Sequence, residues 1–94
     1  MTEAMTAMEV WAGDFSPVFF RLLEETEITI YQISQYTHLD QAYLHRLKTG
    51  ERRNPSPATV IKITLAFAHL SAEFGIRQAE RLFKSIGRTI SIRD

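Results

Sequence analysis

The sequence predicts an all-α fold, a compact five-helix bundle that contains a helix-turn-helix. Apolar residues recur at spacings of three and four, which is the period of a helix face. Residues that cap helices precede these runs, and two such starts, at Thr29 and Asp40, lie so close together that only a tight turn fits between the helices. The 94 residues, 45% of them apolar, suit one small domain with a single core.

Composition excludes several classes of protein. The chain has no cysteine, which removes disulfides and thiolate metal sites. The three histidines do not share a ligand spacing on one helix, so no metal is expected. No catalytic constellation or glycine-rich phosphate loop is present, and we expect neither an enzyme nor a cofactor. Apolar runs far shorter than about 20 residues and the lack of a basic leader favour a cytoplasmic protein without a membrane partner.

Charge is distributed unevenly although the net charge is zero. Residues 1–27 carry six acids against one arginine, whereas residues 28–70 carry five cations against two acids, and residues 71–94 five against three. Such asymmetry points to a polyanionic partner. The alternative is that most of these charges belong to solvated helix faces.

The first predicted helices follow a loose leader of residues 1–14. The pair Ser16-Pro17 predicts a helix over 17–25, because a hydroxyl cap precedes a proline at the first helical position. The second helix, 30–37, starts with a capping box in which Thr29 and Gln32 exchange hydrogen bonds.

A third helix is predicted over 41–49, after a cap at Asp40 and before a left-handed end at Gly50. It buries Leu44 and Leu47, and the rest of its surface is polar. Because its apolar stripe is so narrow, the helix is suited to lie on a surface other than the core of its own domain.

The last two helices are predicted over 57–70 and 72–86. The first begins at Ser56-Pro57 and is apolar on most sides, so we expect it to be the central buried helix. The second, capped by Ser71 and interrupted by Gly75, carries a coiled-coil seam that either packs on the domain's own core or forms a dimer contact. The residues assigned to this contact are Ile76, Ala79, Phe83 and Ile86.

Residues from about Ser16 to Phe74 resemble the helix-turn-helix domain of the phage lambda repressor and Cro type, the XRE-like family. The resemblance rests on ITIYQIS, the turn HLD, the segment QAYLHRLKTG and the following RRNPSPATVIKITLAFA. It covers about two thirds of the chain and implies a DNA-binding domain over 15–74, with residues 75–94 as a possible dimerisation element. It also implies a phage-repressor-like regulator of transcription that binds duplex DNA, usually as a homodimer; whether it acts as an activator or a repressor stays open. The sequence departs from the family pattern at Ile30, His38, Lys48 and Arg53.

Within this resemblance, the helix after the turn enters the major groove. Base readout is assigned to Gln41, Tyr43, His45 and Arg46 for their hydrogen-bonding groups, and to Ala42 for an apolar contact with a thymine methyl group. Contacts to backbone phosphates are assigned to Thr29, Lys48, Thr49, Arg52 and Arg53. The three tyrosines are more often packing residues than stacking platforms.

An alternative function keeps the same fold without reading DNA. A protein-interaction module, or an antitoxin that binds both DNA and a toxin, would use the region of Trp11 or the C-terminal helix for its protein partner. The neutral net charge and the acidic first 27 residues favour this alternative.

Overall fold

The computed structural model describes residues 15–86, which form five α-helices and no strand, so the all-α prediction is confirmed. The leader with Trp11 and the predicted helix end at Gly87 lie outside this range. No helix within it is long and apolar enough to cross a membrane. The helices are α2 (Phe15–Thr26), α3 (Ile30–Thr37), α4 (Gln41–Thr49), α5 (Pro57–Leu70) and α6 (Ile76–Ser85).

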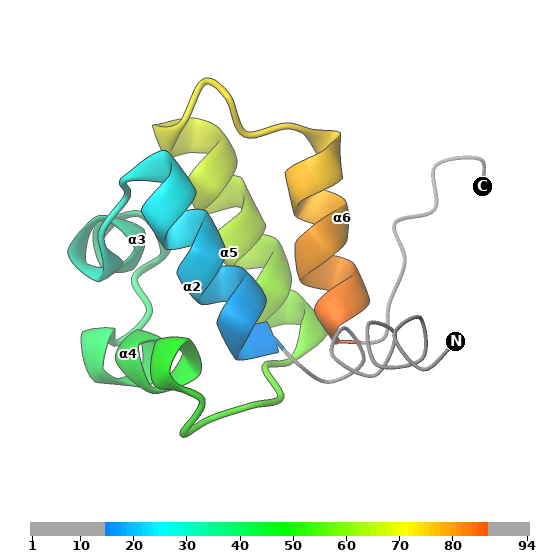
Figure 1. Cartoon of the computed structure of the whole chain (residues 1–94). Coiled ribbons are helices and arrows are strands. Elements are labelled where there is room, and N and C mark those ends of the chain that lie inside the picture. Colours follow the sequence, from blue (N-terminus) through cyan, green and yellow to red (C-terminus); the bar gives the residue numbers. More distant parts are fainter. Residues whose placement is uncertain (1–14, 87–94) are drawn as a thin grey trace, which may run out of the picture.

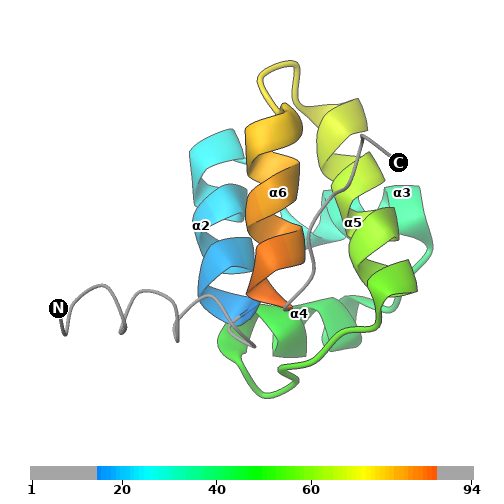
Figure 2. The ribbon, with the colours of Figure 1, turned by 90° about the vertical axis from the view of Figure 1, so that its right-hand side faces the viewer.

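Three helices lie side by side and two shorter ones complete the bundle. α2 contacts both α4 and α6, and α5 contacts α3 and α6. α2 and α6 run in opposite directions next to each other, while α4 lies across one end of the bundle (Figures 1 and 2). α4 therefore has one side on the bundle and another directed away from it.

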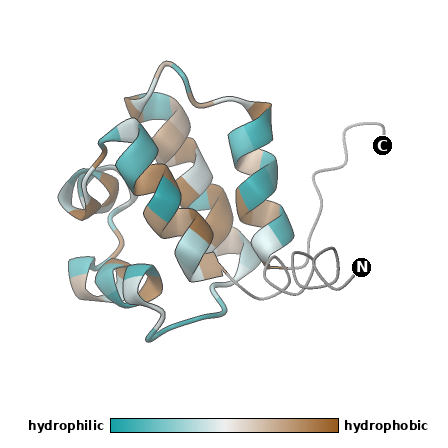
Figure 3. Ribbon diagram, in the orientation of Figure 1, coloured by the Kyte–Doolittle hydropathy of each residue, from teal (hydrophilic) through white to brown (hydrophobic). Residues whose placement is uncertain are grey.

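The core is built from residues of every helix. Phe19 is fully buried, and its ring centroid lies 5.3 Å from that of Phe15 and 6.1 Å from that of Phe67, the latter pair edge to face. Hydrophobic residues are concentrated along α5, and hydrophilic residues dominate the visible surface of α6 (Figure 3). The other fully buried apolar residues are Leu22, Ile33, Leu44, Leu47, Val60, Ile63, Ala66 and Leu82.

Three of the predicted helix starts are confirmed. Thr29 forms the capping box with Gln32, Asp40 accepts the N–H of Tyr43, and Ser56 accepts the N–H of Thr59 with Pro57 at the first helical position. These caps fix where α3, α4 and α5 begin. The cap at Asp40 therefore also limits the turn between α3 and α4.

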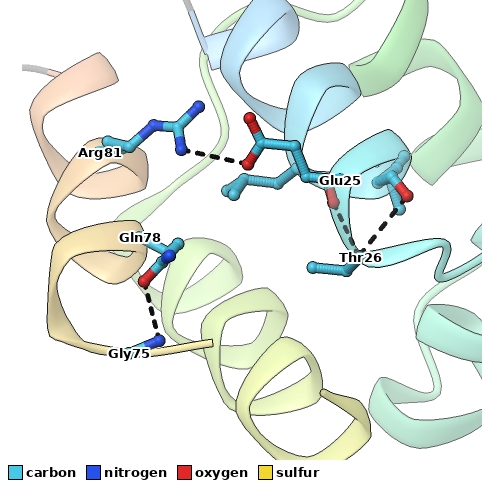
Figure 4. A network of polar contacts seen from close by, with 7 residues as sticks. Glu25, Thr26, Gly75, Gln78 and Arg81 are labelled. Carbon is cyan, nitrogen blue, oxygen red and sulfur yellow. Dashed lines mark hydrogen bonds and ion pairs between the residues drawn. The ribbon is translucent and has the colours of Figure 1, made fainter. Parts of the chain in front are cut away.

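Two predicted starts are wrong. α2 already includes Phe15, so Ser16 is a helical residue and not a cap, and its buried Oγ has no hydrogen-bond partner within residues 15–86. α6 begins at Ile76 and not at residue 72. Gly75 is its N-cap and donates its N–H to Gln78 Oε1 at 2.9 Å, as Figure 4 shows, so Gly75 does not interrupt the helix. Ser71 instead ends α5.

The helix over 57–70, which we expected to be the central buried helix, is buried on one side only. Val60, Ile63, Ala66 and Phe67 are buried, but Ile61 and Leu65 are 48% and 54% exposed. α3 and α6 are the main neighbours of α5, and they cover only part of its circumference.

Candidate nucleic-acid interface

The turn between α3 and α4 is held by short-range hydrogen bonds. His38 has a left-handed backbone (φ 66°), and its N–H donates to the carbonyl of Ser34 at 2.7 Å. The Ser34 hydroxyl donates to the carbonyl of Leu39 at 2.7 Å, and Leu39 packs against the core. The turn thus keeps a bulky residue in a conformation that glycine adopts more easily, because its neighbours fix it there.

α4 is anchored on one side and open on the other. Leu44 and Leu47 are fully buried in the core. Gln41, Ala42, His45 and Arg46 are exposed, while Tyr43 is half-buried. The structure therefore brings the residues assigned to base readout onto the outward side of one helix, with Tyr43 at its margin.

The start of α3 adjoins this open side of α4. A shallow hollow is lined by Ile30 together with Gln41, Ala42, His45 and Arg46, and by Glu51. A second hollow has Thr29, Ile30 and Tyr31 on one side and His45 and Lys48 on the other. The N-terminal end of α3 and the exposed side of α4 thus form one continuous surface.

The capping box determines what Thr29 can offer to a ligand. Its N–H donates to Gln32 Oε1 at 2.9 Å, and its hydroxyl accepts the N–H of Gln32 at 3.1 Å. Because the N–H groups of Thr29 and Gln32 are used in the box, those of Ile30 and Tyr31 are the donors that remain at this helix end.

The loop after α4 is tied to the helix through one carbonyl. The carbonyl of Arg46 accepts the N–H groups of Gly50 and Arg52, each at 3.0 Å, and the Thr49 hydroxyl at 3.2 Å. The Thr49 hydroxyl also accepts the N–H of Glu51 at 3.4 Å, so it is engaged within the loop. The chain can fold back toward α4 in this way because Gly50 has a left-handed backbone, with φ 94°.

The cations around α4 are placed on aromatic rings or left exposed. The Arg52 guanidinium lies 5.7 Å from the centroid of the Tyr43 ring, and Lys48 Nζ lies 5.9 Å from that of Phe20. Arg53 is exposed. Cation–π contacts hold a charged group near a surface while keeping it accessible. Residues 15–86 contain no group of three acidic or histidine side chains that could hold a metal ion.

Tyr31 is a surface residue, although a packing role was the expectation for the tyrosines. Its side chain is 57% exposed and lines the hollow that also contains His45 and Lys48. Its place in the first turn of α3, next to the half-buried Ile30, is the signal that could have identified Tyr31 as an exposed residue of this surface.

The residues assigned to a dimer contact have different environments. Ala79 is buried, and Phe83 and Ile86 pack against the core of the same chain. Ile76 is 58% exposed. Of the four, only Ile76 presents most of its side chain to solvent.

Comparison with known proteins adds nothing to this picture, because no family model, curated protein or solved structure matches the chain.

Proposed function

We propose that this chain is a sequence-specific duplex DNA-binding regulator of transcription that inserts α4 into the major groove. The observation that carries the proposal is the exposed side of α4, where amide, imidazole and guanidinium groups project from a helix anchored by two buried leucines. Gln41 can form a bidentate contact with adenine, and Arg46 with guanine. Ala42 offers an apolar contact to a thymine methyl group.

Phosphate contacts would flank this reading surface on two sides. Lys48, Arg52 and Arg53 supply cations at the end of α4 and in the following loop. At the other side, the N–H groups of Ile30 and Tyr31 stand at the positive end of the α3 dipole, which favours a phosphate. Contacts on both sides would orient α4 without themselves selecting a sequence.

Selection of bound sites from random duplex DNA, followed by affinity measurements over a range of salt concentrations, tests the proposal. We expect a recurrent motif and an affinity that falls steeply as salt rises, because phosphate contacts release counterions. If affinity did not depend on salt, or if no motif were recovered, sequence-specific binding would be ruled out.

Two copies of the chain would bind a site with two half-sites. The surface that supports this homodimer is a stripe on α5, in which Ala58, Ile61, Leu65 and Ala68 are all exposed. Its order is symmetric: in an antiparallel pair, Ile61 would face the partner's Leu65, and Ala58 the partner's Ala68. Such self-complementarity is what a two-fold interface requires.

Sedimentation analysis of two matched variants distinguishes the possible dimer surfaces. Leu65→Glu should convert a dimer into a monomer, whereas Ile76→Glu, which changes an exposed residue of α6, should leave it intact. The opposite result would transfer the contact to α6. A monomeric parent chain would exclude both.

A protein-interaction module with the same fold is the second candidate, favoured by the zero net charge of the chain. It could be an antitoxin that contacts its toxin through the N-terminal or C-terminal segment. The salt series separates the two functions, since a module that does not bind DNA should give no salt-dependent DNA affinity.

A further inference from the structure

A groove of about 320 Å³ lies between α2 and α6. Its walls come from the first half of α2 and from the polar side of α6, and none of the residues assigned to DNA contacts lines it. The lining residues are Pro17, Val18, Arg21, Arg77, Glu80, Arg81 and Lys84.

The charge in this groove is strongly biased. Four of the lining residues are cations and one is an acid. Arg81 forms an ion pair with Glu25 at 3.3 Å, seen in Figure 4, and this pair links α6 to α2. Within residues 15–86, Arg21 and Arg77 form no ion pair, although they stand on opposite walls.

The arrangement matches the needs of one class of ligand. Guanidinium groups bind carboxylates and phosphates through two parallel hydrogen bonds. Pro17 and Val18 give the α2 wall an apolar part that can contact a carbon skeleton. The volume is at the lower end of the range for small-molecule pockets.

We propose that the groove between α2 and α6 binds a small organic anion that carries phosphate or carboxylate groups, held between Arg21 and Arg77. The ligand supplies the counter-charge that Arg21 and Arg77 do not receive from residues 15–86. This proposal does not depend on DNA binding, because it concerns other residues and a different ligand.

Titration of the ¹⁵N-labelled full chain, followed by NMR, tests the proposal. The probes are glucose 6-phosphate, citrate and inorganic phosphate, with glucose as the uncharged control. We expect saturable shifts of the amides of Val18, Arg21, Arg77 and Arg81 with glucose 6-phosphate or citrate, and none with glucose. Stronger binding of glucose 6-phosphate or of citrate identifies the preferred acidic group, and weaker binding of inorganic phosphate shows that the carbon skeleton contributes.

Two variants locate the site. The double variant Arg21→Gln/Arg77→Gln should weaken binding at least about tenfold, since both charged hydrogen-bond donors are lost. The control Lys62→Gln removes an exposed cation of α5 outside the groove and should leave affinity unchanged. The proposal is wrong if neither organic anion gives saturable shifts at millimolar concentration, or if the control loses as much affinity as the double variant.

Discussion

The main-chain N–H of Arg52 donates to the main-chain carbonyl of Arg46 at 3.0 Å. The backbone of the loop that carries Arg52 and Arg53 is thereby attached to the last turn of α4. Arg46 is proposed to contact a base, and Arg52 is proposed to contact a backbone phosphate. The link fixes the spacing of their main chains. It depends on Gly50, whose left-handed conformation turns the chain back toward the helix.

Gly50→Ala should therefore lower the free energy of unfolding by about 1 kcal/mol, because alanine is strained at positive φ. Space is not the cause: a Cβ at this position would lie 3.7 Å from Ser16 Oγ, an ordinary contact. Urea denaturation measures the effect. Glu51→Ala is the control, since Glu51 is an exposed residue of the same loop without a positive φ, and it should change stability by less than half as much.

His38 presents the reverse case. It has a left-handed backbone conformation that is strained for a residue with a side chain and that glycine adopts without strain. His38→Gly removes about 1 to 2 kcal/mol of left-handed strain and adds about 0.4 to 1 kcal/mol of unfolded-chain entropy. We expect a net gain between about 0 and about 1.6 kcal/mol in the free energy of unfolding, measured by thermal or urea denaturation, with DNA affinity unchanged. Glu27→Gly, at the other non-glycine residue with positive φ (60°) within 15–86, should behave similarly. A loss of stability in both variants would mean that the side chains outweigh the strain.

Base readout and phosphate contact predict different losses of affinity. Gln41→Ala and Arg46→Ala should each weaken binding to a selected site by about 1 to 3 kcal/mol and relax the preference at one position. Arg52→Ala should weaken binding to all sequences alike and reduce the salt dependence. Fluorescence anisotropy with selected and scrambled duplexes measures both quantities. An equal loss on both duplexes for all three variants would contradict the assignment.

Local signals explain why most of the helix ends could be predicted. Thr29, Asp40 and Ser56 cap through bonds that reach only three residues along the chain, so the sequence contains the whole motif. Ser16 and Ser71 have the same chemistry, but Phe15 is already helical and Gly75 takes the cap of α6. A capping residue shows that a start is possible, and the packing around it decides whether the start is used.

Exposure was harder to predict than helix position. Ile61 and Leu65 alternate with buried residues on a helix whose sequence is apolar on most sides, so periodicity could not separate its covered from its open side. In α4 the separation was possible, because only Leu44 and Leu47 interrupt a polar surface. The outward side of α4 could therefore be predicted from the sequence. The groove between α2 and α6 could not, because it depends on how two helices that are far apart in the sequence pack against each other.

Within residues 15–86, Thr64 and Thr37 offer a test that compares a buried hydroxyl group without a partner and a half-buried hydroxyl group with two. Thr64 Oγ1 is buried and has no hydrogen-bond partner among the residues that the structure describes, whereas Thr37 Oγ1 donates to the carbonyl of Ile33 at 2.8 Å and accepts the N–H of Leu39 at 3.1 Å. A buried polar atom without a partner costs about 1 to 3 kcal/mol. Replacement by valine keeps the shape and removes that cost at Thr64, but breaks two bonds at Thr37. Thr64→Val should therefore raise the free energy of unfolding by about 1 kcal/mol, and Thr37→Val should lower it by about as much. Urea denaturation of both variants measures the difference, and a loss of stability in Thr64→Val would show that this hydroxyl is satisfied in solution.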